Sequence, residues 1–298
     1  MKNNLISYLQ MARPHHWIKN CLIFIPLLTS HRLTEKPLII AALVLFFAQS
    51  LLSSSTYIIN DLLDYKSDRN HPAKRNRPIA SQKVSKRSAI VQATLFGGLS
   101  LYLGSLISIS VVYLMLGYAV VSLLYSLHLK KLVAIDIILL SIFFIYRIFL
   151  GHLGLNIAHS MWLLAFCFFF FFGLAVSKRV IELLDDSFLK KDKKDETYRR
   201  GYSTEDLHIL YPLGITSGLI SILIYCLYIN SAAVTILYSA PYFLWGNSIV
   251  FLTLLTRYWM LIGRKKVCAD PVLFHLKDPF SYGMGTLIIV FIFLATFQ

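Results

Sequence analysis

Charged residues are scarce in this sequence. Asp, Glu, Lys and Arg together make up 15% of the 298 residues, whereas 57% are hydrophobic and the mean hydropathy is +0.64. This excludes a soluble domain of the same length, which would need far more charge on its surface. The composition instead predicts a polytopic membrane protein, and no linker is long enough to separate two folded domains. We therefore expect one integral-membrane domain over residues 1–298.

Cysteine is scarce as well. The four cysteines, Cys21, Cys167, Cys226 and Cys268, show neither paired nor metal-type spacing. This argues against a disulfide framework and a cysteine-ligated metal centre, and it predicts that these side chains pack as small apolar groups. Residues 1–20 are polar and lack the pattern of a signal peptide, so the first helix is expected to serve as its own insertion signal.

Acidic residues are outnumbered by basic ones, 15 to 29, which gives a net charge of +14. An excess of basic residues can indicate nucleic-acid binding. Here, however, the basic residues lie mainly in the connections between apolar runs, as the positive-inside rule predicts for a membrane protein. We therefore expect a membrane environment and no nucleic-acid partner.

Nine apolar runs are candidate membrane spans. They cover residues 17–30, 38–59, 89–108, 110–127, 132–155, 161–176, 208–229, 232–256 and 282–297. The first is short and carries Pro26, so it is expected to lie tilted or partly in the interface. If the N-terminus is cytoplasmic, every Lys and Arg except Arg32, Lys36 and Arg147 lies on the cytoplasmic side. The sequence thus predicts an all-α bundle of about nine spans with its polar loops on that side.

A row of acids begins the connection after the second run. On a helix, Asp61, Asp64 and Asp68 would occupy positions i, i+3 and i+7, and the Asn60 amide would lie beside them on the same face. Carboxylates placed in this way repel one another unless a cation offsets them. Hard oxygen ligands suit Mg²⁺, which usually binds a few carboxylates together with substrate phosphate oxygens. The three acids are therefore predicted metal ligands.

The sign of the charge reverses directly after these acids. Pro72 and Pro78 prevent a regular helix there. The segment carries basic side chains of the kind that bind phosphate oxygens, namely Arg69, His71, Lys74, Arg75 and Arg77. Acids for a metal followed by cations for phosphate indicate a diphosphate-binding site. The alternative is a solvated charged loop between two helices, although such loops rarely place three acids on one face.

A second polar group surrounds the start of the fifth run. It comprises Tyr125, Lys130, Lys131, Asp136 and Arg147. A buried charge is costly in a bilayer, so Asp136 and Arg147 must pair, meet a ligand or reach water. They are about three helical turns apart, which disfavours a direct pair, and we expect each to face a polar cavity. Lys130 and Lys131 could equally be ordinary membrane anchors.

A third polar group ends the sixth run, at Lys178, Arg179 and Glu182, with Asp185 and Asp186 following. The spacings i, i+3 and i+4 would allow a surface network of ion pairs that needs no ligand. Charges of both signs where a helix leaves the membrane also suit phosphate or a metal.

Two neighbouring segments are less specific. Residues 190–200 are expected to form a solvated loop, and the segment from Arg199 to Tyr202 is a candidate mobile cover for the site. The Phe-rich residues 166–172 are expected to face lipid or fill the core, although the same residues would suit a groove for an isoprenoid chain.

These motifs together resemble the UbiA-type intramembrane prenyltransferase superfamily, and within it the decaprenyl-phosphate phosphoribosyltransferase branch. The superfamily motif Asn-Asp-x-x-Asp-x-x-x-Asp is present from Asn60 to Asp68, and the basic extension from Arg69 to Ala80 is similar to that of the branch. Further matches are Arg13-Pro-His-His-Trp17-Ile-Lys19-Asn20, Tyr125 to Lys130 with Asp136 and Arg147, and Lys178, Arg179 and Glu182. The resemblance covers essentially the whole chain. It implies a nine-span helical bundle in a bacterial inner membrane, with a polar cavity open to the cytoplasm and a lateral gap for the lipid.

The resemblance also implies a reaction. Members that prenylate aromatic rings usually carry a second Asp-rich motif after the sixth span, where this chain has Lys178, Arg179 and Glu182. Extra cations suit a donor with an additional phosphate, such as phosphoribosyl diphosphate, and a polyprenyl phosphate acceptor. We therefore predict Mg²⁺-dependent phosphoribosyl transfer to a polyprenyl phosphate. The alternatives are a prenyltransferase that uses a polyprenyl diphosphate donor and a small acceptor, and a non-catalytic carrier of lipid phosphates.

On this hypothesis the predicted residues divide into two sets. The catalytic residues are Asp61, Asp64 and Asp68, which hold Mg²⁺, together with Lys130 and Asp136. The substrate-binding residues are Lys19, Asn60, Arg69, His71, Lys74, Arg75, Arg77, Tyr125, Arg147, Lys178, Arg179 and Glu182.

Overall fold

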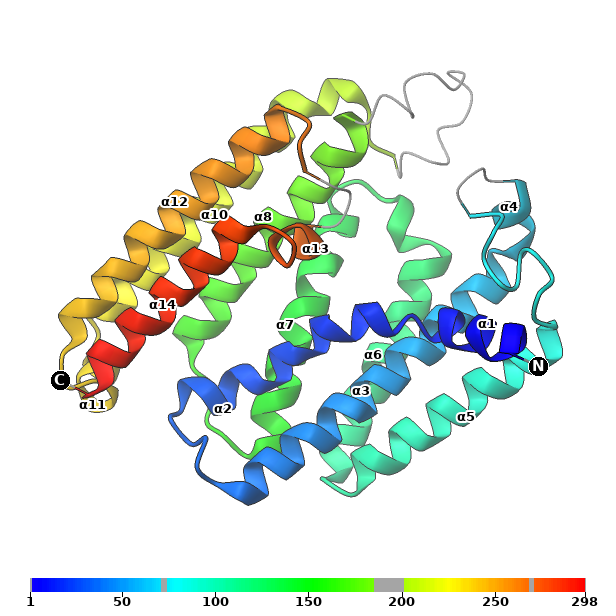
Figure 1. Cartoon of the computed structure of the whole chain (residues 1–298), viewed down its shortest axis with the longest axis horizontal. Coiled ribbons are helices and arrows are strands. Elements are labelled where there is room, and N and C mark those ends of the chain that lie inside the picture. Colours follow the sequence, from blue (N-terminus) through cyan, green and yellow to red (C-terminus); the bar gives the residue numbers. More distant parts are fainter. Residues whose placement is uncertain (1, 71–73, 185–200, 268–270, 298) are drawn as a thin grey trace. The chain divides into compact units, whose positions relative to one another are not determined.

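The protein is helical throughout the part of the chain that its computed structural model describes, which is residues 2–70, 74–184, 201–267 and 271–297 (Figure 1). The chain forms two compact units. One contains residues 1–129 and 146–159, and the other contains residues 130–145 and 160–298. Helix α7 (Ile135–Leu155) contributes its first half to the second unit and its second half to the first. The predicted all-α fold is confirmed.

The first unit is organised around α3 (Lys36–Leu63), its longest helix. The 3-10 helix η1 (Pro14–Phe24) and the helix α5 (Lys86–Ser105) both pack along α3. The remaining helices are α1 (Lys2–Ala12), α2 (Ile25–Thr29), α4 (Tyr65–Asn70) and α6 (Ile109–Leu127). Ser85 and Ser108 begin α5 and α6, because each hydroxyl accepts a hydrogen bond from a first-turn amide that has no partner within the helix.

The second unit contains four long helices that run side by side (Figure 1). They are α8 (Met161–Leu184), α10 (Leu207–Ile229), α12 (Trp245–Gly263) and α14 (Pro279–Phe297). Shorter elements are η4 (Thr204–Asp206), α11 (Ala232–Leu237), η5 (Pro241–Leu244) and α13 (Pro271–His275), while η2 (Leu129–Lys131) precedes α7.

Small residues allow α8 and α10 to pack closely. A Cβ atom at Gly173 would lie 3.2 Å from the carbonyl oxygen of Gly214, and the Ser217 hydroxyl donates to the Phe169 carbonyl at 2.6 Å. Helices in a membrane associate through such close contacts because lipid provides no hydrophobic driving force between them. The backbones of α8 and α10 are thus in near contact.

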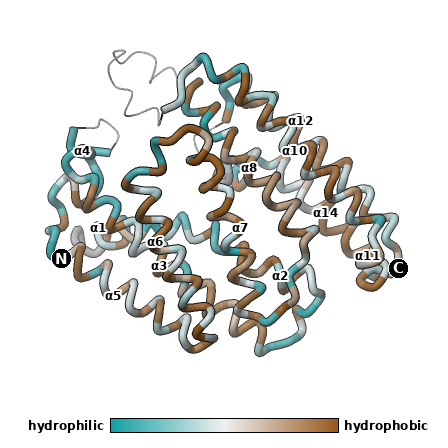
Figure 2. The backbone as a smooth tube through the Cα atoms, turned by 180° about the vertical axis from the view of Figure 1, so that it is seen from behind, coloured by the Kyte–Doolittle hydropathy of each residue, from teal (hydrophilic) through white to brown (hydrophobic). Residues whose placement is uncertain are grey.

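Within the described residues, six helical segments are long and apolar enough to cross a membrane. They are α3, α6, α7, α8, the continuous segment Thr204–Ile229 that contains α10, and α14. Helices α5 and α12 are 20 and 19 residues long and are less apolar, so the predicted count of nine is approximate. Figure 2 shows apolar colouring along the long helices and hydrophilic colouring at α4.

Two predicted spans differ in detail from the structure. The run 17–30 forms part of η1 and the five-residue α2. The run 232–256 is not one helix, because α11 ends at Leu237 and helical structure resumes only at Pro241. Proline disfavours the helical conformation of the residue before it, and Ala240 has φ −129° and ψ 69°.

The contact between α10 and α12 provides a test of the packing. A Cβ atom at Gly214 would lie 2.4 Å from the buried Trp259 ring, whereas one at Gly98 in α5 would meet nothing within 4 Å. We expect Gly214→Ala to cost about 1–3 kcal/mol through overpacking. The control Gly98→Ala should be neutral or stabilising by up to about 1 kcal/mol, since alanine favours a helix. Thermal unfolding in detergent, followed by tryptophan fluorescence, measures both, and equal unfolding temperatures would contradict the close contact.

Candidate active site

A row of polar contacts joins η1 to α3 in the first unit. Asn20 donates to the Ser50 hydroxyl at 2.9 Å and the Trp17 indole donates to the Ser54 hydroxyl at 3.0 Å. As the residue numbers fall along η1 they rise along α3, so the two segments run antiparallel. Ser50 and Ser54 are one helical turn apart, and both are fully buried. Unpaired hydroxyls there would be costly, so these bonds fix the register between η1 and α3.

The row ends at the first predicted acid. One guanidinium nitrogen of Arg13 donates to both carboxylate oxygens of Asp61, at 2.7 and 2.9 Å. Arg13 has φ 50° and ψ 55°, a left-handed conformation at the point where α1 ends and η1 begins. The Ser54 hydroxyl holds this turn by donating to the Ala12 carbonyl at 2.7 Å, and the Arg13 guanidinium lies 5.3 Å from the centre of the Tyr57 ring. Arg13 was not among the predicted site residues.

Arg77 joins two of the three acids. Its Nη1 atom donates to Asp61 at 2.9 Å and to Asp68 at 2.7 Å, and both carboxylates are buried, with exposed fractions of 2% and 3%. Buried carboxylates need such partners, because a charge that leaves water without one is strongly destabilised. The structure therefore brings together Asp61, Asp68, Arg13 and Arg77 as one buried cluster of mixed charge.

The helix that was predicted to carry all three acids is interrupted. Helix α3 ends at Leu63, and Asp64 lies outside helical geometry before α4 begins at Tyr65. The prediction of one continuous helix through the three acids was therefore wrong. The Asp64 amide still donates to the Asn60 carbonyl and the Asp64 carbonyl accepts from the Asp68 amide, both at 2.9 Å. These bonds preserve the helical spacing, so Asp61 and Asp68 still converge. Asp favours such helix ends because its side chain competes for backbone hydrogen bonds.

Among the described residues, no three Asp, Glu, His or Cys side chains form a group that could hold a metal. The buried pair Asp61 and Asp68 nevertheless supplies hard oxygen donors. Mg²⁺ commonly takes one or two carboxylates and completes its shell with water and substrate phosphate oxygens. The donor set therefore fits Mg²⁺ bound together with a phosphorylated substrate, rather than Mg²⁺ held by protein side chains alone.

The other predicted substrate-binding residues of the first unit differ in their exposure to solvent. Arg69 and Arg75 are exposed, Lys19, Lys74, Asn60 and Tyr125 are partly buried, and His71 lies outside the described residues. The exposed arginines are available to a ligand from solution, whereas Arg13 and Arg77 already bind carboxylates.

Arg147 is buried in the same unit, at the far end of the polar row. Its Nε atom donates to the side-chain oxygen Oδ1 of Asn20 at 2.7 Å, and its guanidinium lies 5.7 Å from the centre of the Tyr118 ring. Tyr118 stacks on Tyr146, whose hydroxyl donates to Gln49 of α3 at 3.1 Å. The predicted need of Arg147 for a polar partner is thus met within the protein, and the contact with Asn20 anchors η1 against α7.

The second unit contains a separate buried ion pair. Arg179 donates from Nε to Asp136 at 2.6 Å and from Nη2 to the other oxygen of the same carboxylate at 3.2 Å. Arg179 is 1% exposed and Asp136 is fully buried. The remaining nitrogen, Nη1, donates to Glu182, which is one turn further along α8 and partly exposed. The expected ion pair between Arg179 and Glu182 is present, but Arg179 is buried and does not belong to a surface network.

Tyr202 supports this cluster from a distant part of the sequence. Its hydroxyl accepts a hydrogen bond from the Ala134 amide at 2.9 Å, in the turn that leads to Asp136, and Ala134 has φ 65°. Burial raises the pKa of the Tyr202 phenol to about 12, so it stays neutral at physiological pH. Tyr202 is 3% exposed in this structure, and the proposed mobile cover stays a prediction. The rest of that segment, Asp185, Asp186 and residues 190–200 lie outside the described residues.

Several residues of the polar row were not among the predicted site residues, although the segment from Arg13 to Asn20 was named as a match to the family. They are Arg13, Trp17, Asn20, Ser50 and Ser54. One signal was available, because serines one turn apart in an otherwise apolar helix must find hydrogen-bond partners in a membrane. The identity of those partners depends on how η1 lies along α3, which no spacing in the sequence specifies.

The buried pair in the second unit generates a stability prediction. Arg179→Met leaves the Asp136 carboxylate buried without this guanidinium, and we expect a loss of about 3–5 kcal/mol. The double variant Asp136→Leu/Arg179→Met removes both charges and should recover most of that stability. Thermal unfolding of the two variants in detergent tests this. A double variant no more stable than Arg179→Met would show that the pair is not the cause.

Comparison with known proteins identifies the family of this chain. The model of the UbiA prenyltransferase family matches residues 21–277. An uncharacterized protein, y4nM, of Sinorhizobium fredii is 31% identical over 283 residues, which are 95% of this chain and 54% of that protein. The nodulation protein NoeC of Azorhizobium caulinodans is 30% identical over 77% of this chain and 73% of its own length. The chain thus spans about half the length of the first of these relatives.

A third relative has a more specific name. Decaprenyl-phosphate phosphoribosyltransferase of Mycolicibacterium smegmatis is 32% identical over 207 residues, which are 67% of this chain and 65% of that protein. Among solved structures, a UbiA homolog from Archaeoglobus fulgidus bound to GPP and Mg²⁺ has a TM-score of 0.67 at 16% identity. It covers 97% of this chain and 98% of its own, so the fold is shared over nearly the whole length.

Proposed function

The chain belongs to the UbiA prenyltransferase family, and on this basis we propose that it transfers a 5-phosphoribosyl group from phosphoribosyl diphosphate to a polyprenyl phosphate, with release of pyrophosphate. It is an integral membrane transferase of that family. The relatives named decaprenyl-phosphate phosphoribosyltransferase support the choice of donor and acceptor. We further propose a bacterial inner membrane, a cytoplasmic N-terminus and a site that faces the cytoplasm, because this orientation agrees with the distribution of Lys and Arg.

The observation that carries the proposal is the buried cluster of Asp61, Asp68, Arg13 and Arg77. Two carboxylates that share one cationic group are suitable donors for Mg²⁺, and Asp64 lies between them in the sequence. When bound there, Mg²⁺ would neutralise charge that develops on the leaving pyrophosphate. The two arginines beside the same acids donate to carboxylates in this structure, and with a metal on those acids their planar guanidinium groups would instead donate to phosphate oxygens of the substrate. A diphosphate is bound best where carboxylates that can hold a metal and guanidinium groups lie close together.

The bonds that change can be stated from the substrates. An ionised oxygen of the lipid phosphate attacks C1 of the ribose, the bond from C1 to the diphosphate oxygen breaks, and pyrophosphate leaves with the bonding electron pair. Phosphate is already ionised at neutral pH, so no general base is needed. Arg13 and Arg77, with the exposed Arg69 and Arg75, would orient the donor and stabilise the departing charge.

The second unit bears on the choice of donor. A prenyl diphosphate donor would be expected to use further acids near the end of α8. There, in the described part of the chain, the Arg179 guanidinium lies between Asp136 and Glu182 and binds both, in the position that a second metal would need. We therefore favour a single metal. Lys130, Asp136, Lys178, Arg179 and Glu182 remain predicted site residues on this reading, and Arg179 would act by positioning Glu182.

The reaction can be tested directly. Purified protein in detergent, with polyprenyl phosphate, Mg²⁺ and radiolabelled phosphoribosyl diphosphate, should move label into the organic phase. EDTA should abolish the transfer, and Asp61→Asn or Asp64→Ala should lower it about 100-fold or more through lost charge stabilisation. The control Glu35→Gln changes a partly exposed acid that pairs with Arg32, and should retain activity. If polyprenyl diphosphate is consumed with a small acceptor and no ribose label moves, the protein is a prenyltransferase.

The role of Arg13 in binding the donor can be tested separately. Arg13→Gln removes a donor of charge-assisted hydrogen bonds, each worth about 1.5–3 kcal/mol, so kcat/KM for phosphoribosyl diphosphate should fall about 10- to 100-fold. Arg32→Gln is the matched control, because Arg32 is a partly exposed arginine that binds Glu35. A normal kcat/KM in a folded Arg13→Gln protein would limit Arg13 to a structural partner of Asp61.

A further inference from the structure

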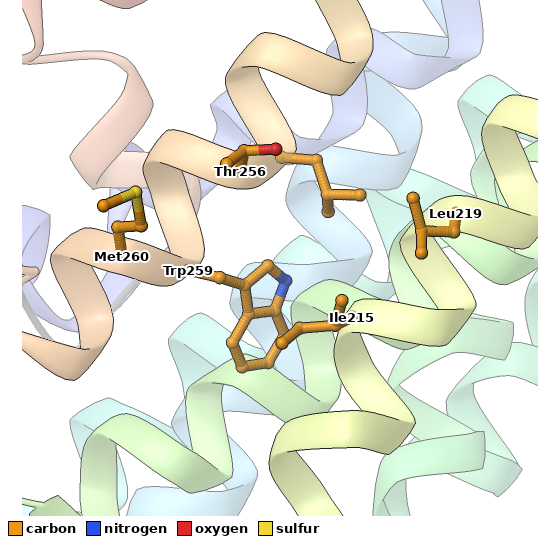
Figure 3. Close-up of a pocket in the computed structure, with 6 residues that line it drawn as sticks. Ile215, Leu219, Thr256, Trp259 and Met260 are labelled. Carbon is orange, nitrogen blue, oxygen red and sulfur yellow. The ribbon is translucent and has the colours of Figure 1, made fainter.

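A furrow runs along the edge of the contact between α10 and α12 (Figure 3). Gly214 and Gly218 are one turn apart on α10, and Cβ atoms at these positions would lie 2.4 Å from Trp259 and Leu255 of α12. Glycine therefore allows the two helices to approach closely. The side chains next to this contact form the furrow, whose lining is Ile215, Leu219, Leu255, Thr256, Trp259 and Met260.

The furrow suits an alkyl chain. Its volume is about 370 Å³, far more than a water molecule needs, and its lining side chains are apolar except for the Thr256 hydroxyl and the Trp259 indole N–H. Leu219 and Met260 on its two sides are 45% and 53% exposed, while the buried Trp259 ring lies between the two helices (Figure 3). Because the protein spans a membrane, apolar side chains exposed on these helices meet lipid.

Apolar contact alone would not select one lipid. A hydrocarbon tail that enters the furrow leaves surroundings that are equally apolar, so the net gain is small. Any preference must come from the headgroup. The charges at the end of the furrow therefore decide which lipid it holds.

Those charges are positive. Thr256, Met260 and Arg264 follow at intervals of four residues, so they lie on one face of α12, with Arg264 about 6 Å beyond Met260 along the axis. Arg264, Lys265 and Lys266 are all exposed where α12 ends. Glu205 and Asp206 of η4, just before α10, carry two negative charges against these three positive ones. Basic side chains at a membrane surface attract anionic lipid headgroups.

We propose that this furrow binds one acyl chain of an anionic phospholipid from the surrounding membrane, with the lipid phosphate on Arg264 and Lys266. The furrow and its basic end lie entirely within the second unit. The cations assigned to the donor, Arg13 and Arg77, belong to the first unit, so this lipid site does not depend on the proposed reaction.

Native mass spectrometry tests the proposal. Protein in detergent is incubated with equal amounts of phosphatidylglycerol and phosphatidylethanolamine, and the retained lipid is identified. Each basic side chain near a membrane surface favours an anionic headgroup about fivefold, so wild type should retain phosphatidylglycerol in clear preference. Arg264→Gln/Lys266→Gln should lose that preference, and Met260→Trp, which fills the furrow without altering charge, should lose the bound lipid.

Matched controls separate the site from general effects. Lys83→Gln/Arg87→Gln removes two exposed charges at the start of α5, and Met161→Trp enlarges an exposed methionine of α8 outside the furrow. Both should bind like wild type. Equal retention of the two lipids by wild type, or an unchanged preference in Arg264→Gln/Lys266→Gln, would overturn the proposal. If polyprenyl phosphate displaces the bound phosphatidylglycerol from wild type at equal concentration, the furrow holds the substrate tail and the proposal is wrong.

Discussion

A carboxylate that is buried in a membrane protein must be neutralised by another part of the same chain or by a ligand, and this requirement organises both units. Asp61 is bound by Arg13 and Arg77, which lie 48 residues before it and 16 residues after it. Asp136 is bound by Arg179, 43 residues later. The ion pairs of Asp61 connect α3 to the non-helical residues Arg13 and Arg77, and that of Asp136 connects α7 to α8. In the first unit the pair with Arg13 fixes the position of η1 along α3. The acids that serve chemistry in the proposed function are thus also what holds the neighbouring segments in place.

Close packing through small side chains is the second constraint. The backbones of α8, α10 and α12 approach closely at four small residues, Gly173, Gly214, Ser217 and Gly218. Such close contacts are needed because the hydrophobic effect does not drive helices together in lipid. This close packing also shapes the surface of the helices that faces lipid. Where glycine lets two helices approach, the larger residues on either side, such as Leu219 and Met260, stand above the contact and leave a furrow between them.

Composition and apolar runs were sufficient to predict the all-α membrane fold, because a long apolar run has few alternatives to a spanning helix. The motif from Asn60 to Asp68 and the resemblance that it carries led to the family that the comparisons show. Local spacing could not predict the break at Asp64, since Asp is tolerated in a helix. The break at Tyr238 to Ala240 did have a local signal in Pro241, which the count of apolar residues did not use. Local spacing also could not find Arg13 or Tyr202, because their partners Asp61 and Ala134 are 48 and 68 residues away. Contacts of that separation are properties of the packed helices and not of any window of sequence.

The left-handed backbone of Arg13 has a consequence for how this position can vary among related sequences. The left-handed conformation at position 13 costs a residue with a Cβ atom about 1–2 kcal/mol. Glycine avoids this cost, and asparagine tolerates the conformation better than most residues. We expect selection to keep an arginine there only while its interaction with Asp61 contributes more than this conformational cost. A lineage that no longer needed the guanidinium would be expected to drift to Gly or Asn at position 13, and not to Lys, so the residue found there reports whether the acidic cluster is still in use.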